Sequence, residues 1–265
     1  MNTEDVISEY SVRTYLKDCS SLFELEVFDT IDSTNTYLKN TVTDDTKAWH
    51  TVIASAQSAG RGRKGRSFIS PAGTGVYLSV LLRPASSAYI ATRITTAAAV
   101  AACLAIEKCT GSKPVIKWVN DVFLNGRKVC GILTEASLNP KTHDPDWVIM
   151  GIGFNIYEPD GGFDKEIENI AGAIAKERSH DLKSRIVAAF LIELHRLAGD
   201  LENADYAGEY KKRSFLIGRN VNVLSGDFSH PATVLDIDEN CHLLVRYEDG
   251  SVEALSSGEV SIRER

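Results

Sequence analysis

No segment limits the possible folds of this chain more than residues 91–110, ATRITTAAAVAACLAIEKCT. The segment is rich in alanine, apolar on nearly all sides at helical spacing, and followed by Gly111, a residue typical of a helix end. A helix without a polar face is stable only where the rest of the chain covers it. The 265 residues are enough to provide that cover. We therefore predict a large domain with this helix in its interior.

Segments of alternating or β-branched apolar residues lie on both sides of that helix and indicate a sheet. Strands are expected over 23–34, 50–57, 75–84, 114–121, 127–137 and 146–157, and a further helix over 182–204. Asn125 and Gly126 are a strong hairpin signal between two of the strands. Residues 1–20 are a polar lead with a helical turn or two, which we interpret as too short for a separate DNA-reading domain.

The pattern changes at Gly218. From there to the C-terminus, short β-branched segments alternate with turn residues, among them Ser225-Gly226 and Asp249-Gly250. Four or five short strands at this spacing predict a small β-barrel or sandwich appended to the main domain.

Composition excludes several classes of protein. A formal net charge of −7 argues against a general affinity for nucleic acid. We expect no membrane span and no secretory or transit peptide, because the apolar runs are short and the first residues are acidic and polar. The five cysteines are scattered without a C-x-x-C pair, which indicates reduced thiols in a cytoplasm and no zinc site.

One loop contrasts with this acidic background. Residues 55–68, SAQSAGRGRKGRSF, carry the four cations Arg61, Arg63, Lys64 and Arg66 among glycines. Three interpretations compete: a solvated loop tip, a nucleic-acid patch, and an anion cradle. In a cradle, glycines let the backbone close on a phosphate or carboxylate while guanidinium groups neutralise it. The absence of interleaved aromatic residues weakens the nucleic-acid interpretation, and the loop alone does not decide between the others.

Four other segments occur with the loop in one order along the chain. They are DSTN at 32–35, KWVND at 117–121, RKVCGILTE at 127–135 and GIGFN at 151–155. Together with the loop they resemble the biotin protein ligases, which attach biotin to a lysine of a carrier domain. The resemblance extends from about Phe28 to the C-terminus, and the ending SGEVSIR matches the family's closing strand.

The resemblance implies an α+β fold. A mixed-sheet catalytic domain with helices packed on it, biotin/lipoate ligase-like, would occupy 21–216, and a small C-terminal SH3-like β-barrel would occupy 217–265. The lead over 1–20 then implies the form without the family's N-terminal DNA-binding domain.

The resemblance also implies a two-step reaction that uses biotin, ATP and Mg²⁺. Biotin would react with ATP to give biotinyl-5′-AMP and pyrophosphate, and a carrier lysine would then take the biotinyl group. The metal would be held through the phosphates, since the sequence shows no direct metal motif. The implied partner is the biotin carboxyl-carrier domain of a carboxylase, with no DNA and no membrane, for a cytoplasmic monomer or homodimer.

The family pattern assigns roles residue by residue. The implied catalytic residues are Lys128, Arg63, Asp121 and Arg66. The implied biotin-binding residues are Ser33, Thr34, Asn35, Gln57, Gly60, Arg61 and Gly131. The implied ATP-binding residues are Arg63, Arg66, Phe68, Trp118, Asn120, Lys128, Asn155 and Arg263.

Without the resemblance, simpler interpretations apply to the same positions. Ser33 and Thr34 are ordinary helix caps. Lys128 is an exposed lysine at a strand end, and Asp121 is a turn aspartate. Arg263 is a solvated arginine near the C-terminus.

Three positions depart from the family pattern. Phe68 stands where tryptophan is common, which keeps an aromatic ring over the ligand and loses an indole donor. Val119 stands where proline is common, which predicts a looser turn. Phe154 stands where an aliphatic residue is usual, and we expect it to reshape one wall of the pocket.

Two other functions remain open. One is lipoate or octanoate attachment by an enzyme of related fold, which would need neither the cationic loop nor the STN segment. The other is a nucleic-acid-binding regulatory module, for which binding would be sensitive to salt and would occur without ATP turnover.

Overall fold

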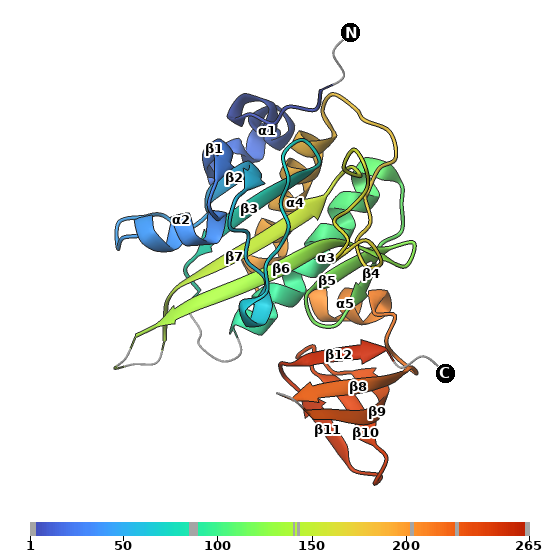
Figure 1. The fold of residues 1–265 in the computed structure, drawn as a ribbon. Coiled ribbons are helices and arrows are strands. Elements are labelled where there is room, and N and C mark those ends of the chain that lie inside the picture. The colour runs from blue at the N-terminus through green and yellow to red at the C-terminus, as the bar shows by residue number, and fades with distance from the viewer. Residues whose placement is uncertain are drawn as a thin grey trace.

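The computed structural model describes residues 4–84, 90–139, 141, 144–201, 204–225 and 228–262. Figure 1 shows two bodies, a larger one with a long sheet and a smaller one of strands at the C-terminal end. The elements of the larger body are α1 (Glu9–Leu16), β1 (Glu24–Ile31), α2 (Thr34–Thr41), β2 (His50–Gln57), β3 (Gly75–Leu82), α3 (Ile90–Thr110), β4 (Val115–Lys117), β5 (Asp121–Leu124), β6 (Arg127–Leu138), β7 (Pro145–Asn155), α4 (Leu182–Ala198) and α5 (Tyr206–Arg213). The elements of the smaller body are β8 (Asn220–Ser225), β9 (Phe228–Ile237), β10 (Leu243–Tyr247), β11 (Val252–Leu255) and β12 (Glu259–Ile262).

The larger sheet is mixed, as the family resemblance implied. Its strand order is β1-β2-β3-β7-β6-β5-β4. Only β1 and β2 run parallel, and each further neighbouring pair is antiparallel. The predicted segment 114–121 contains β4 and the start of β5, which form a tight hairpin. The second hairpin turns at Asn125 and Gly126, as predicted, and both residues have positive φ.

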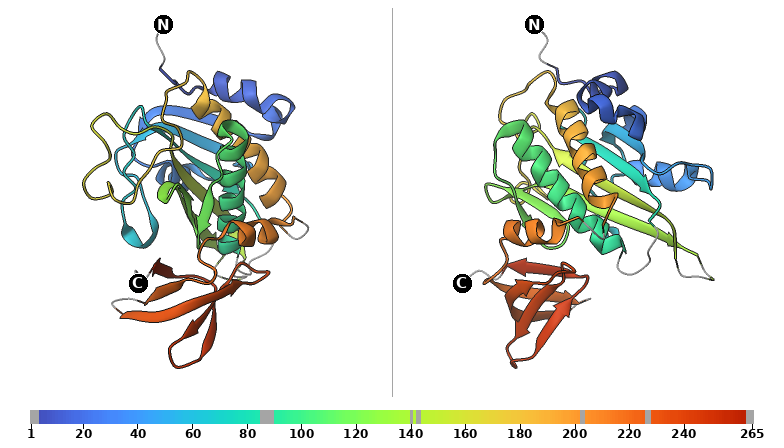
Figure 2. Two further views of the ribbon diagram at one scale, coloured as in Figure 1. Left: turned by 90° about the vertical axis from the view of Figure 1, so that its right-hand side faces the viewer. Right: turned by 180° about the vertical axis from the view of Figure 1, so that it is seen from behind.

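The alanine-rich helix is the centre of the main core, as predicted. α3 packs against α4 and against β6, and α1 packs against α4 on the outer side. Figure 2 shows these helices together on one face of the sheet. Every residue from Ile94 to Cys103 is buried. The helix is long and apolar enough to cross a membrane, so the expectation that no run has that length was wrong; 72% of its most apolar window is buried inside the fold.

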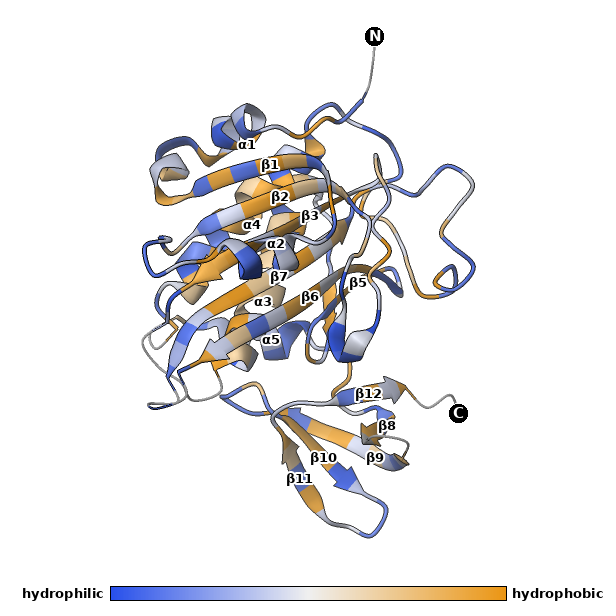
Figure 3. Cartoon of the chain, turned by 60° about the vertical axis from the view of Figure 1, so that its left-hand side comes forward, coloured by the Kyte–Doolittle hydropathy of each residue, from blue (hydrophilic) through white to orange (hydrophobic). Residues whose placement is uncertain are grey.

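The opposite face of the sheet is only partly covered. α2 packs over β2, β3 and β7 through a small apolar cluster, with Leu38 against Val52, Leu81 and Ile149. In Figure 3, α2 and the loop after β2 lie on this face while α3 and α4 lie behind the sheet. The rest of the face is therefore available to form a site.

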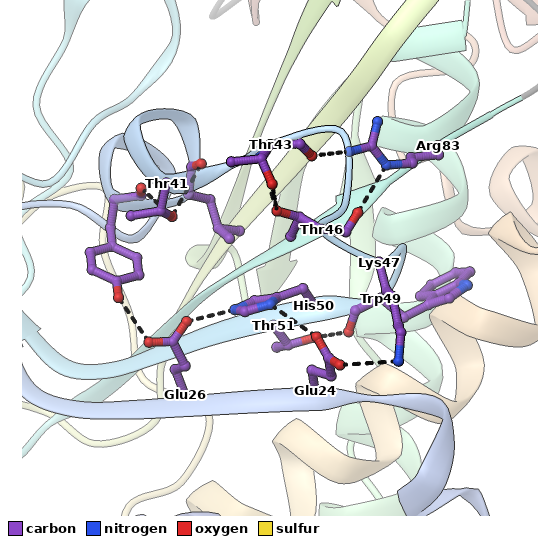
Figure 4. Close-up of polar contacts among 12 residues, drawn as sticks. Glu24, Glu26, Thr41, Thr43, Thr46, Lys47, Trp49, His50, Thr51 and Arg83 are labelled. Atoms are coloured by element: carbon purple, nitrogen blue, oxygen red, sulfur yellow. Dashed lines mark hydrogen bonds and ion pairs between the residues drawn. The ribbon is translucent and has the colours of Figure 1, made fainter.

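A polar network fixes the connection between α2 and β2 (Figure 4). His50 places Nε2 2.6 Å from a carboxylate oxygen of Glu26, and Nδ1 lies 3.4 Å from Glu24. The hydroxyl of Tyr37 donates to Glu26 from α2 at 2.8 Å. Arg83, beyond β3, donates to backbone carbonyls in the same connection. These contacts hold α2, and with it the STN segment at its N-terminal end.

α5 was not predicted from the sequence. Its eight residues are mostly polar and include Gly208, so neither propensity nor pattern indicates a helix. The helix is held by two tyrosines four positions apart, Tyr206 and Tyr210, which are both buried. The Tyr210 hydroxyl donates to the carbonyl of Val119 at 3.0 Å. Val119, at the turn that was expected to be looser without proline, is itself buried.

The smaller body is a five-stranded antiparallel sheet in the order β11-β10-β9-β8-β12, which confirms the small β module predicted after Gly218. Its own apolar interior includes Val221, Val234 and Val245, which are buried. One contact to the larger body is buried at both ends, because the indole Nε1 of Trp118 donates to the carbonyl of Cys241 at 2.9 Å.

Candidate active site

Two neighbouring cavities lie where the uncovered face of the large sheet meets the loop after β2. We call them the first and second cavities. The first is lined by Ser33, Thr34, Asn35, Gln57, Arg61, Gly62, Arg63, Phe68, Asn120, Lys128, Gly131, Ile132, Leu133, Gly151, Ile152 and Gly153. The second is lined by Gly62, Arg63, Lys64, Arg66, Ser67, Phe68, Lys117, Trp118, Asn120, Asp121, Lys128, Gly258, Glu259 and Val260. Five residues belong to both, so the cavities share a wall that carries Arg63, Phe68 and Lys128.

The floor of the first cavity is formed by three glycines, which carry no side chains. Gly131 of β6 pairs with Gly153 of β7, and Gly151 lies two residues before Gly153 on the same face. A Cβ on Gly153 would lie 2.5 Å from the ring of Phe68, and one on Gly131 would lie 2.9 Å from it. A Cβ on Gly151 would overlap the amide of Asn35. The glycines therefore let a ring and an amide approach the sheet more closely than side chains would allow.

One end of the first cavity is polar and uncharged. The backbone N–H of Thr34 donates to the side-chain oxygen of Gln57 at 2.9 Å, and the Thr34 hydroxyl reaches the same oxygen at 3.2 Å. Ser79, in the sheet below, donates to the hydroxyl of Thr34 at 2.7 Å. The other side of Gln57 donates to Ser70 at 3.0 Å. Hydrogen bonds thus hold the Thr34 and Gln57 side chains in fixed positions at this end, which we call the neutral end.

Ser33 was predicted both as a helix cap and, from the family resemblance, as a biotin-binding residue. Ser33 is the N-cap of α2 and accepts weakly from the N–H of Thr36, at 3.5 Å. Its side chain is buried and lines the first cavity. Asn35 also lines the cavity, but its amide is fully engaged, with Ser79 on one side and with Leu133 and Glu135 on the other. Asn35 therefore supports the wall.

The cationic loop is folded as an irregular hairpin. Phe68 donates its backbone N–H to Gly60 at 2.9 Å, and Gly62 donates to Arg66 at 2.7 Å. A single 3₁₀ turn, Arg63–Gly65, forms the tip. Gly60 does not line either cavity, and its role is to let the loop close, because a Cβ there would collide with the carbonyl of Phe68.

Each arginine of the loop has a defined partner. Arg61 makes a two-point ion pair with Glu135 of β6, at 2.8 and 3.0 Å. Arg63 donates to Asn120 at 3.0 Å and to the carbonyl of Gly258 at 3.1 Å. The remaining pair joins Arg66 and Glu259 at 2.7 and 3.0 Å. These arginines therefore tie the loop to the larger body at Glu135 and Asn120 and to the smaller body at Gly258 and Glu259.

The cations of this loop favour the ionised form of Glu259. Burial opposes its negative charge, but the hydrogen bond from Arg66 and the charges of Arg66, Lys64 and Lys117 outweigh burial and lower the pKa of Glu259. Glu259 and Glu135 were not predicted as site residues. The only signal was position, since Glu135 ends one motif and Glu259 lies in the closing-strand motif.

Lys128 and Asp121 face each other across the hairpin of β5 and β6. Their charged atoms are 2.7 Å apart, and their side chains are 26% and 21% exposed. The Lys128 ammonium also lies 6.0 Å from the centre of the Phe68 ring, on the shared wall. The backbone of Lys128 is fixed from the other side, where its N–H donates to Ile170 at 2.8 Å. A lysine on the shared wall is thus paired with a carboxylate that lines the second cavity.

Trp118 and Asn120 complete the wall around the second cavity. Asn120 donates to the carbonyl of Ile132 at 2.9 Å while its oxygen accepts from Arg63. Trp118 is buried, with its only donor committed to Cys241, so it offers a ring surface and no polar group.

Like Gly60, Asn155 and Phe154 lie away from the two cavities. Asn155 lines neither cavity, and its side-chain amide donates to the carbonyl of Lys128 at 3.5 Å. Phe154 does not shape the pocket, and that expectation was wrong: it alternates with Gly153 and packs into the core against Phe190, with ring centres 5.5 Å apart. Arg263 lies outside the described residues.

The comparisons with known proteins agree with this geometry. Residues 27–155 match the Biotin/lipoate A/B protein ligase family, and residues 216–263 match the Biotin protein ligase C terminal domain. The bifunctional ligase/repressor BirA of Escherichia coli is 31% identical over 241 residues, covering 89% of this chain and 73% of that protein. The biotin–[acetyl-CoA-carboxylase] ligase of Paracoccus denitrificans is 42% identical over 118 residues, covering 43% of this chain and 47% of that protein.

Solved structures show the same fold. The biotin protein ligase from Aquifex aeolicus, solved in complex with biotin and ATP, superimposes with a TM-score of 0.76 at 24% identity, covering 91% of this chain and 99% of that one. The extent of the match to the Escherichia coli protein, the two matched domains and the shared fold together leave one assignment. This chain belongs to the biotin protein ligase family.

Proposed function

We propose that this chain activates biotin with ATP and transfers the biotinyl group to a lysine of a carrier domain. One observation carries the proposal: Arg63 and Lys128 both stand on the wall that the two neighbouring cavities share. A reaction that joins a carboxylate to a phosphate needs cations where its two anionic substrates meet. We assign biotin to the first cavity and the nucleotide to the second.

In the first step a carboxylate oxygen of biotin bonds to the α-phosphorus of ATP, and pyrophosphate leaves. Two unit charges about 4 Å apart repel by about 4 kcal/mol at an effective dielectric of about 20. Arg63 and Lys128 offset this repulsion and stabilise the charge that develops on the phosphate. The ring of Phe68 and the loop that carries it exclude water from the mixed anhydride.

The residues present fit a magnesium ion that arrives on ATP. Across the described ranges, no group of three His, Cys, Asp or Glu side chains could hold a metal ion. The lining of the second cavity includes two carboxylates, Asp121 and Glu259, among five cations. When bound to the phosphates, Mg²⁺ supplies charge neutralisation at the leaving group.

In the second step the amine of the carrier lysine bonds to the acyl carbon, and the bond to AMP breaks. Asp121 is the group we assign to this amine, because its carboxylate lines the second cavity and lies 2.7 Å from Lys128 on the shared wall. It can accept a hydrogen bond from the incoming ammonium group, orient it, and take its proton. Lys128 then stabilises the departing AMP phosphate.

The protein partner we propose is a biotin carboxyl-carrier domain. The relative in Paracoccus denitrificans is named for acetyl-CoA carboxylase, which supports a carboxylase as the source of that domain. We propose the cytoplasm as the compartment, because all five cysteines are free thiols.

The test is a direct assay of the first step. The purified protein is incubated with Mg²⁺, α-labelled ATP and biotin, lipoate or octanoate, and the AMP ester and pyrophosphate are measured. We expect an adenylate to form with biotin and not with lipoate or octanoate, because the neutral end of the first cavity suits a cyclic urea. Adenylate with lipoate or octanoate instead would move the assignment to that branch of the family. A folded protein with no turnover on any acid would overturn the proposal.

A further inference from the structure

The first cavity has opposite electrostatic character at its two ends. The end shared with the second cavity carries Arg63 and Lys128, while the far end presents the uncharged Thr34 and Gln57. A carboxylic acid enters such a cavity with its charge toward the cations. This direction is also the only productive one, because the carboxylate must meet the nucleotide.

A free guanidinium group on Arg61 would remove this difference in charge between the two ends. Arg61 also lines the first cavity, and its partner Glu135 contacts Asn35, the neighbour of Thr34 at the far end, so a free guanidinium group there would attract a carboxylate. An acid could then bind in reverse, with its charged end away from the nucleotide.

Glu135 removes this second cation. Its two oxygens take the guanidinium group of Arg61 at 2.8 and 3.0 Å, and one of them also accepts from the Asn35 amide at 3.0 Å. The Asn35 bond locates the pair, because Asn35 is part of the cavity wall. The Glu135 side chain is 21% exposed, and a two-point arginine–carboxylate pair of this kind is stronger than a single contact.

We propose that Glu135 determines the direction in which the acid substrate binds, by neutralising Arg61 at the far end of the cavity. The proposal rests on the proposed function, which sets which end must receive the carboxylate. It makes Glu135 a specificity-determining residue that touches neither reacting group.

Glu135→Gln tests the proposal, because it keeps the shape and the amide contact to Asn35 while freeing the charge of Arg61. The probe is heptanedioate, a seven-carbon chain with a carboxylate at each end. Its binding is measured by calorimetry on the wild type, on Glu135→Gln and on the double variant Arg61→Gln/Glu135→Gln. Glu253→Gln, on the smaller body, is the matched control for loss of one carboxylate.

We expect Glu135→Gln to bind heptanedioate about tenfold more tightly than the wild type, because each end of the acid then meets a cation. The double variant should lose this gain, and the control should not show it. In the adenylation assay, kcat and KM for biotin should fall together in Glu135→Gln, as non-productive reversed binding requires.

Unchanged heptanedioate binding in a folded Glu135→Gln protein would overturn the proposal. A raised KM for biotin with no gain for heptanedioate would do the same, since it would show that Glu135 merely supports the wall. Failure of the proposed function is a separate result, because there the wild type itself would neither bind nor adenylate biotin.

Discussion

At the scale of single residues, the site consists of side chains whose polar groups are mostly committed before a ligand arrives. Thr34 and Gln57 hold each other, and Asn120 holds Arg63. Such prior fixation lowers the cost of ordering the site during the reaction. Lys128 is different, because its charged partner Asp121 is another reactive group.

This difference predicts separate effects on the two steps. Lys128→Met should reduce the rate of adenylate formation by about 10³-fold, since it removes a cation from the developing phosphate charge. Asp121→Asn should form biotinyl-5′-AMP and then transfer it slowly, so that the intermediate accumulates. Single-turnover assays with and without a carrier domain separate the steps. Lys39→Met, on the exposed side of α2, is the control, and normal turnover by Lys128→Met would contradict the mechanism.

A second prediction at this scale concerns the glycines at the floor of the first cavity. Gly153→Ala places a methyl group 2.5 Å from the ring of Phe68, so the ring must move into the first cavity. We expect the KM for biotin to rise about tenfold while the melting temperature changes little, because the ring is the far end of a side chain. Phe68→Leu in the same background should recover part of the loss. An unchanged KM in Gly153→Ala would show that biotin does not approach this floor.

At the scale of elements, local patterns predicted what depends on local sequence. An apolar, β-branched run that ends at a turn signal placed β2, and the absence of a polar face placed α3 in the interior. α5 was missed because its stability comes from two buried tyrosines and not from propensity. The pairing of Arg66 with Glu259 could not be predicted either, because 193 residues separate them and a motif does not specify its contact partner.

The contact between the cationic loop and β12 predicts a pH dependence. The pKa of Glu259 is lowered in the folded protein, so this residue stabilises the fold above the ordinary glutamate pKa of 4.5, and the contribution is lost as the pH falls through the lowered value. The wild type should therefore melt above Glu259→Gln at pH 7, and the gap should close at acid pH. Thermal melts of both proteins from pH 7 to pH 3 test this. A gap that stays constant with pH would exclude a role for the charge.

At the scale of the whole molecule, the two cavities differ in construction. Every residue that lines the first cavity lies between Ser33 and Gly153, within the larger body. The second cavity also takes Gly258, Glu259 and Val260 from the smaller body. Biotin binding should therefore depend on one body, whereas nucleotide binding should depend on how the two bodies are joined.

Trp118→Phe tests this division. The change removes the indole donor to Cys241 and leaves that buried carbonyl unpaired, which should lower the free energy of unfolding by about 1–3 kcal/mol. Because the same contact fixes the smaller body against the second cavity, the KM for ATP should rise several-fold while the affinity for biotin, measured without ATP by calorimetry, stays unchanged. The stability loss follows from any buried hydrogen bond, so the selectivity between ligands is the decisive result. Equal weakening of biotin and ATP would mean that the smaller body supports the whole catalytic sheet, and that the second cavity has no separate dependence on it.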